Sequence, residues 1–114
     1  LIPIYESEVA RVFELPSETW ARRISGVFSN EIVNQDPDRA QAVLTRNQDD
    51  ESYTVSLRAP LSNRTGADEI CSRFETGGGR KAAAGINQLN EDKKMNFIAS
   101  IEIYYSPLGK SIDS

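Results

Sequence analysis

Three consecutive glycines followed by two cations form the segment best suited to chemistry: Gly77, Gly78, Gly79, Arg80 and Lys81. Without side chains, the glycines allow a ligand to approach the backbone, and their N–H groups can converge on an anion. The Arg80 guanidinium can hold two phosphate oxygens at once, and Lys81 adds a second positive charge. We therefore expect a phosphate-binding loop at this point of the chain.

The small residues after the two cations, Ala82–Ala84, are expected to begin a helical turn that Gly85 ends. The free N–H groups at the start of such a turn would add partial positive charge beside the loop. Spacing alone leaves an alternative open, a flexible glycine loop with a solvated Arg–Lys pair. The segment matches neither the Walker A pattern nor the dinucleotide-binding G-x-G-x-x-G pattern.

Several classes of site are excluded by composition. The chain contains no histidine and one cysteine, which removes Ser–His and Cys–His nucleophiles, the usual zinc sites and an internal disulfide. The acidic run Asp49–Glu51 is expected to be a solvated turn, and Cys71 a small buried apolar residue. The sequence therefore predicts no catalytic residues and no metal ligands in this chain.

The net charge of −4 argues against a general polyanion binder, because long-range repulsion opposes nucleic acid. Phosphate recognition would have to be local, and the cations allow it, because several lie in one part of the sequence: Arg58, Arg64, Arg73, Arg80 and Lys81.

The chain is short enough for a single domain over residues 1–114, and it does not begin with Met, so we expect a piece of a longer protein. No apolar run reaches the roughly 20 residues that span a bilayer. No basic signal-peptide start is present either. Together with the sparse cysteine usage, this predicts a cytoplasmic protein without a membrane segment.

The clearest local pattern is a β-hairpin, with strands over Ala42–Arg46 and Ser52–Arg58 joined by a polar turn. Alternation in the second strand is expected to bury Tyr53, Val55 and Leu57. It presents Ser56 and Arg58 on the opposite face.

Helices and one more strand are expected to flank this hairpin. Glu6–Phe13 suits either a short helix or an extended lead-in. Ser17 is expected to cap a helix that runs to Phe28. Its core face would carry four apolar residues, with Trp20 as anchor: Trp20, Ile24, Val27 and Phe28.

The later elements are expected in the order helix, strand, helix and tail: Ala67–Phe74, Ile86–Leu89, Glu91–Tyr105 (capped by Asn90) and Ser106–Ser114. The last helix would make apolar contacts through Met95, Ile98, Ile101, Ile103 and Tyr105. The predicted fold is α/β (α+β), a single small domain in which a mixed β-sheet with an antiparallel hairpin is flanked by helices.

The ordered set of strand, short helix and glycine loop resembles a known family. Thr76–Gly85 is similar to the "GGGH-x-x-A-A-G" signature of the DHH-associated C-terminal domain, found in RecJ-type exonucleases, nano-RNases and exopolyphosphatase-related proteins. Tyr53–Arg58 resembles the family's "y-x-V-S-L-R" strand, and Ala67–Phe74 its short helix. The resemblance covers residues 42–105.

The resemblance implies a substrate-binding role for seven residues: Arg58, Gly77, Gly78, Gly79, Arg80, Lys81 and Gly85. Arg80 stands where the family usually has histidine. An arginine keeps a positive charge for phosphate but cannot act as an acid or base near neutral pH. The Asp-His-His motif of the family's catalytic domain is absent from this sequence.

The implied function is a module that holds the phosphates of a short oligonucleotide, a nucleotide or polyphosphate. Hydrolysis would belong to an N-terminal DHH domain of the same chain, with divalent Mn or Mg as its cofactor. No cofactor is expected in this part of the protein. The alternative from another class is a non-catalytic protein–protein interaction or oligomerisation domain, including a homodimer through an exposed sheet edge. A self-contained enzyme is the third reading.

Overall fold

Six strands form one mixed sheet in the order β1-β2-β3-β4-β6-β5. The computed structural model describes residues 2–106. The strands are β1 (Tyr5–Glu6), β2 (Ala10–Leu15), β3 (Ala40–Arg46), β4 (Ser52–Arg58), β5 (Gly77–Gly79) and β6 (Ala83–Asn90). β2 and β3 run parallel, and each of the other pairs is antiparallel. The predicted fold class is confirmed.

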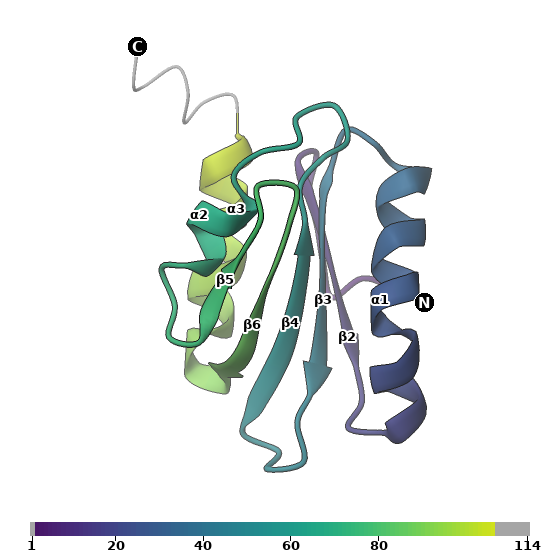
Figure 1. Cartoon of the computed structure of the whole chain (residues 1–114), viewed down its shortest axis with the longest axis vertical. Helices are drawn as coiled ribbons and strands as arrows, with labels where there is room; N and C mark the ends of the chain where they lie inside the picture. Colours follow the sequence, from purple (N-terminus) through teal and green to yellow (C-terminus); the bar gives the residue numbers. More distant parts are fainter. Residues whose placement is uncertain (1, 107–114) are drawn as a thin grey trace.

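Helices cover both faces of this sheet (Figure 1). Helix α1 (Thr19–Gln35) lies on one face and forms the crossover that the parallel pair β2 and β3 requires. The other face carries α2 (Ala67–Cys71), the 3₁₀ turn η1 (Glu91–Lys93) and α3 (Lys94–Tyr105). The larger apolar core lies on the α2/α3 side, and a smaller one lies under α1.

The predicted hairpin is confirmed. β3 pairs with β4, and Tyr53, Val55 and Leu57 are buried as their alternation predicts. Glu6–Phe13 is not helical: Glu6 belongs to the edge strand β1, Ala10–Phe13 belong to β2, and residues 7–9 connect the two strands. Ile86–Leu89 is a strand, within the longer β6. The Ser106–Ser114 tail lies outside the described residues except for Ser106.

The prediction for the first helix was wrong in its buried face. α1 begins after Glu18 rather than Ser17 and continues seven residues beyond Phe28. Its buried residues are Ala21, Ser29, Ile32 and Val33, whereas Trp20, Ile24 and Val27 are exposed. Small residues allow the helix to approach the sheet closely, so the larger apolar side chains face outward.

The two later helices differ less from expectation. α2 ends at Cys71 rather than Phe74, and α3 is preceded by η1 rather than being continuous from Glu91. Cys71 is buried as predicted. In α3, Ile98, Ile101 and Tyr105 are buried, while Met95 and Ile103 are exposed.

Candidate functional site

A hollow of about 340 Å³ lies between the C-terminal half of α1, the end of β4 and the turn that precedes β6. We call it the Arg58 hollow. Its lining comes from three stretches of chain: Asn30, Val33 and Asn34; Arg58, Ala59, Leu61 and Arg64; and Ala82 and Ala83. In Figure 1 this region is the upper end of β4, where α1 approaches its own C-terminus.

Arg58 is the half-buried cation of this hollow. Its Nε donates to Oδ1 of Asn30 at 3.1 Å, and its Nη1 donates to Oγ of Ser56 at 3.0 Å. Within residues 2–106, no carboxylate forms an ion pair with it. Burial lowers the pKa of its guanidinium, although arginine stays protonated in proteins. The hollow therefore holds a partly desolvated positive charge, and its lining contains a second cation, Arg64, but no carboxylate.

Arg46 provides the contrast inside the same sheet. Its Nη2 donates to Oε1 of Glu91 at 3.0 Å, and Asp50 and Glu14 lie 3.4 and 3.7 Å from its guanidinium. The hydrogen bond that Arg46 donates to the Glu91 carboxylate raises the pKa of Arg46. The charge of Arg46 is therefore balanced by carboxylates of the protein, and it is not a candidate for binding an external anion.

Two of the predicted glycines lie on the same face of the sheet as Arg58. The register places Ser56 opposite Gly85, and Gly85 opposite Gly78, which makes one row across β4, β6 and β5. Side chains two residues apart on a strand share a face, so this row lies beside Arg58 on the α1 side. A Cβ at Gly78 would meet nothing within 4 Å. Gly78 therefore leaves an open strip of backbone on the site's side of the sheet.

Gly77 and Gly79 alternate with Gly78, so they lie on the opposite face, and packing accounts for both. A Cβ at Gly77 would overlap the carbonyl oxygen of Cys71. Gly79 has a φ of 146° and approaches Ala84 too closely for any side chain. Gly85 is constrained as well, since a Cβ there would lie 2.8 Å from the carbonyl oxygen of Val55.

The expected anion-binding nest and helical turn are wrong. Gly77–Gly79 is a strand, in which successive N–H groups point to opposite sides and do not converge. The N–H of Gly77 donates to Phe74 O at 3.1 Å, and that of Arg80 to Ala83 O at 2.9 Å. The alanines after Lys81 enter β6 instead of a helix, and Gly85 lies inside that strand.

Arg80 and Lys81 occupy the turn between β5 and β6, and both side chains are exposed. The next two residues of this turn line the Arg58 hollow, so the two cations lie at its margin. No ion pair of either side chain occurs within the described residues. Arg80 and Lys81 thus lie at the same end of the sheet as Arg58 and Arg64, whereas Arg73, also named from the sequence, lines a different hollow.

Sequence reasoning missed the contribution of α1 to this hollow. Asn30 and Asn34 face it from successive turns of the helix, and Arg64 reaches it from the loop after β4. The helix was expected to end at Phe28, and residues 34–38 were expected to form a turn, so the last two turns of α1 were not predicted as helix. Two asparagines four residues apart are a weak signal that only the longer helix would have revealed.

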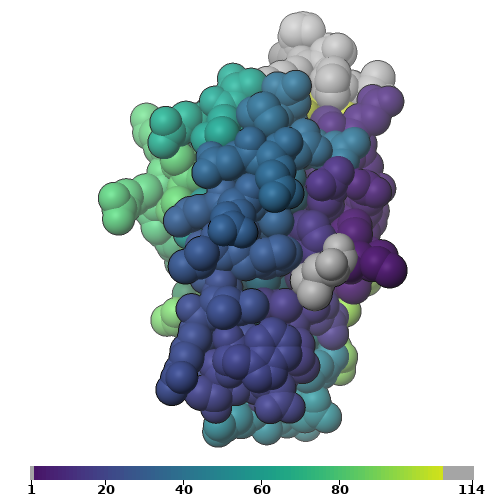
Figure 2. All heavy atoms as spheres, turned by 90° about the vertical axis from the view of Figure 1, so that its right-hand side faces the viewer, coloured from purple at the N-terminus to yellow at the C-terminus, as the bar shows by residue number. Residues whose placement is uncertain are grey.

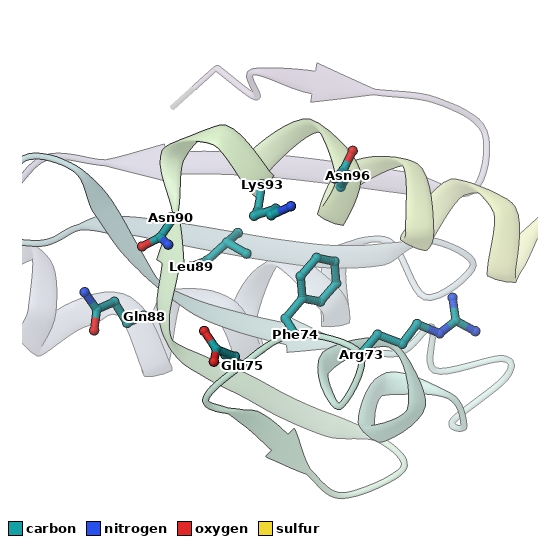
Figure 3. Close-up of a pocket in the computed structure, with 8 residues that line it drawn as sticks. All are labelled: Arg73, Phe74, Glu75, Gln88, Leu89, Asn90, Lys93 and Asn96. Carbon is teal, nitrogen blue, oxygen red and sulfur yellow. The ribbon is translucent and has the colours of Figure 1, made fainter.

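A second hollow, of about 370 Å³, lies on the α2/α3 side and is shown in Figure 3. Phe74 and Leu89 form its apolar part, and Phe74 packs edge-on against Phe97 with ring centroids 5.8 Å apart. The Glu75 carboxylate lies among the lining side chains, while the Arg73 guanidinium points away from them (Figure 3). An anion is better suited to the Arg58 hollow, whose lining contains no carboxylate.

Two further classes of site are absent from the described part of the chain. No group of three or more His, Cys, Asp or Glu residues there is arranged to hold a metal ion. No helix of residues 2–106 has the length and apolar character needed to cross a membrane.

Comparison with known proteins gives one family match. The family model of the DHHA1 domain matches residues 8–106. No curated protein sequence matches the chain significantly.

Two solved structures share the fold at low sequence identity. A pGpG-specific phosphodiesterase, PggH from Vibrio cholerae, is 11% identical with a TM-score of 0.57. The match covers 89% of this chain and 34% of that one, so this chain spans about a third of the phosphodiesterase. The C-Ala domain of the Aquifex aeolicus alanyl-tRNA synthetase is 16% identical with a TM-score of 0.55, and the match covers 89% of both chains.

Proposed function

The chain belongs to the DHHA1 domain family, and from this premise we propose that it is a non-catalytic module that holds the phosphates of a nucleotide or short oligonucleotide. The observation that carries the proposal is Arg58, a half-buried cation without a carboxylate partner in the described residues, in a hollow beside the side-chain-free strip of Gly78.

The charge of the hollow suits a phosphate better than a neutral ligand. Arg58 already uses two of its donors on Asn30 and Ser56, which fix the guanidinium in place. A phosphate bound there would restore the electrostatic stabilisation that Arg58 loses on burial. Arg80, Lys81 and Arg64 would add positive charge from the margin of the same hollow.

The names of the two structural relatives support a nucleotide-type ligand. One is a pGpG-specific phosphodiesterase and the other is part of an alanyl-tRNA synthetase. In this proposal hydrolysis and its divalent metal belong to an N-terminal DHH domain outside these 114 residues. The glycines of the signature would act through the open backbone at Gly78 rather than through a nest of amides.

The experiment that tests the proposal is a calorimetric titration of the chain with mononucleotides, dinucleotides and short single strands. Arg80→Ala is expected to weaken binding by roughly tenfold, the loss typical of one charge-assisted hydrogen bond, with the fold unchanged. Unchanged affinity in this variant would remove Arg80 from the site. Light scattering on the same samples would report a homodimer, the competing role.

A further inference from the structure

The single tryptophan of the chain is exposed on α1, outside both apolar cores. Trp20 is 51% exposed and Val27 62% exposed. A packing role would place the indole under the helix, where Ala21 and Ser29 are found instead. The indole face is thus available to a ligand.

Trp20 lies on the same side of α1 as the residues that line the Arg58 hollow. The positions Trp20, Arg23, Val27, Asn30 and Asn34 are spaced by three, four, three and four residues, which keeps them on one face of a helix. Asn30 and Asn34 line the hollow. With a rise of 1.5 Å per residue, Trp20 lies about 15 Å along the helix from Asn30. Figure 2 shows α1, in blue, running along the length of this face of the molecule.

The charge on this helical face favours a polyanion over a second copy of the chain. Arg23 is exposed and forms no ion pair within residues 2–106. A two-fold pairing of α1 with another α1, centred between Trp20 and Val27, would bring the two Arg23 side chains together. Glu31 is the one carboxylate of α1, one turn beyond Val27, and it would oppose a polyanion at that point.

We propose that this face of α1 is a track for a single-stranded oligonucleotide whose end phosphate occupies the Arg58 hollow. The strand follows the helix, Arg23 contacts a phosphate along the way, and a base stacks on the Trp20 indole. Aromatic stacking combined with cations that follow the backbone is the usual chemistry of single-strand binding. At 3.4 Å per stacked nucleotide, Trp20 is about four nucleotides from the hollow. The inference rests on the proposed function, because the end phosphate in the hollow determines which nucleotide lies beside Trp20.

Intrinsic fluorescence provides a direct test, because Trp20 is the only tryptophan. The chain is titrated with single strands of two, four, six and eight nucleotides. We expect the dinucleotide to bind without changing the emission, and the strands of six and eight nucleotides, which are long enough to reach Trp20, to quench it. Trp20→Ala should lose about tenfold or more in affinity for the octanucleotide and nothing for the dinucleotide. Trp20→Phe should retain most of the affinity.

Charge variants test the path between the two ends. Arg23→Gln should weaken octanucleotide binding and reduce its salt dependence by about 0.7 in log–log slope, the value for one single-strand phosphate contact. Glu31→Gln should strengthen binding. Met95→Ala and Arg73→Gln serve as controls, because both residues are exposed on the α2/α3 side of the sheet.

The outcomes separate this inference from the proposed function. If the dinucleotide binds and Trp20→Ala leaves octanucleotide affinity unchanged, the track is overturned and the hollow stands. If the wild-type chain forms a dimer that Trp20→Ala disrupts, the face is a protein interface and the track is overturned. If no oligonucleotide of any length binds, both proposals fail.

Discussion

Replacing Arg58 by glutamine separates ligand binding from folding. The substitution removes the positive charge but keeps an amide nitrogen at the position of Nε, which can still donate to Asn30, whereas the hydrogen bond from Nη1 to Ser56 is lost. Arg58 gains no ion pair from the described residues, and burial acts against its charge. The proposed function therefore assigns this charge to ligand binding rather than to folding.

The expected magnitudes follow from these contacts. A hydrogen bond to a charged group contributes about 1.5–3 kcal/mol, so Arg58→Gln should weaken phosphate binding by roughly 10- to 150-fold. The free energy of unfolding should change by less than about 1 kcal/mol, because the loss of the charge-assisted hydrogen bond to Ser56 is offset by removal of a half-buried charge. A modest rise in stability is compatible with this balance.

The assay combines affinity, salt dependence and stability on the same samples. Titration calorimetry with a short single strand, repeated at several salt concentrations, gives the affinity and its slope. Urea unfolding gives the stability. Arg46→Gln is the matched control, because its guanidinium contacts Glu91 and lies 4.7 Å from the centroid of the Tyr53 ring. That variant should lose about 1 kcal/mol of stability and keep its affinity.

Two results would contradict a ligand role for Arg58. If Arg58→Gln binds the strand as tightly as the wild type, with the same salt slope, the uncompensated cation is not a ligand contact. A loss of several kcal/mol of stability would also contradict it, since Arg58 would then be a structural residue of the fold like Arg46.

Three further predictions concern the glycine strand and the buried thiol. Gly77→Ala should destabilise the fold by more than about 2 kcal/mol in urea unfolding, because its Cβ would overlap the Cys71 carbonyl oxygen. Gly78→Asp should keep its melting temperature within a few degrees and lose ligand affinity in calorimetry, because its side chain enters open space on the site's side. Burial, with a smaller contribution from Asp68, raises the pKa of Cys71 to about 12, so the native thiol should not react with a disulfide reagent at pH 8. Because the unfolded thiol ionises first, above about pH 8.5, the free energy of unfolding should fall as pH rises from there to 12. Urea unfolding of the wild type and of Cys71→Ala at pH 8 and pH 10 isolates the loss of unfolding free energy that comes from this thiol. We expect that loss to be about 2 kcal/mol at pH 10.

The hairpin could be read from sequence because local pattern and tertiary environment agree there. β4 alternates apolar and polar residues, and the sheet has a core on one side and a partly open face on the other. That alternation was enough to place Ser56 and Arg58 on the face opposite Tyr53, Val55 and Leu57. Arg58 was predicted as a site residue because the strand resembles that of the family, and its lack of an ion pair among the described residues became visible only in the structure.

The orientation of α1 could not be read in the same way. Two faces of this helix could pack on the sheet. One carries large apolar residues such as Trp20 and Val27, and the other carries Ala21, Ser29 and Ile32. Periodicity favours the larger side chains. The choice depends on how closely the helix approaches β3, a tertiary distance on which the sequence of the helix carries no direct information.

The glycine loop became a strand because of its neighbour in space. Glycine and alanine have little intrinsic preference for strands. The free edge of β4 pairs with β6, however, and β6 in turn pairs with Gly77–Gly79. A local interpretation of an Ala-rich segment after a glycine run cannot anticipate this pairing, so it predicted a helical turn.

The family signature therefore combines residues of two kinds. Gly77, Gly79 and Gly85 lack side chains because carbonyl groups or backbone atoms lie where a Cβ would be, so their replacement tests the fold. Gly78 has no such neighbour, and Arg80 is exposed in the turn, so their replacement tests the ligand. A loss of binding in a Gly77 variant would therefore say little about substrate contact. The same loss in a Gly78 or Arg80 variant of unchanged stability would place the phosphate on the open strip beside Arg58.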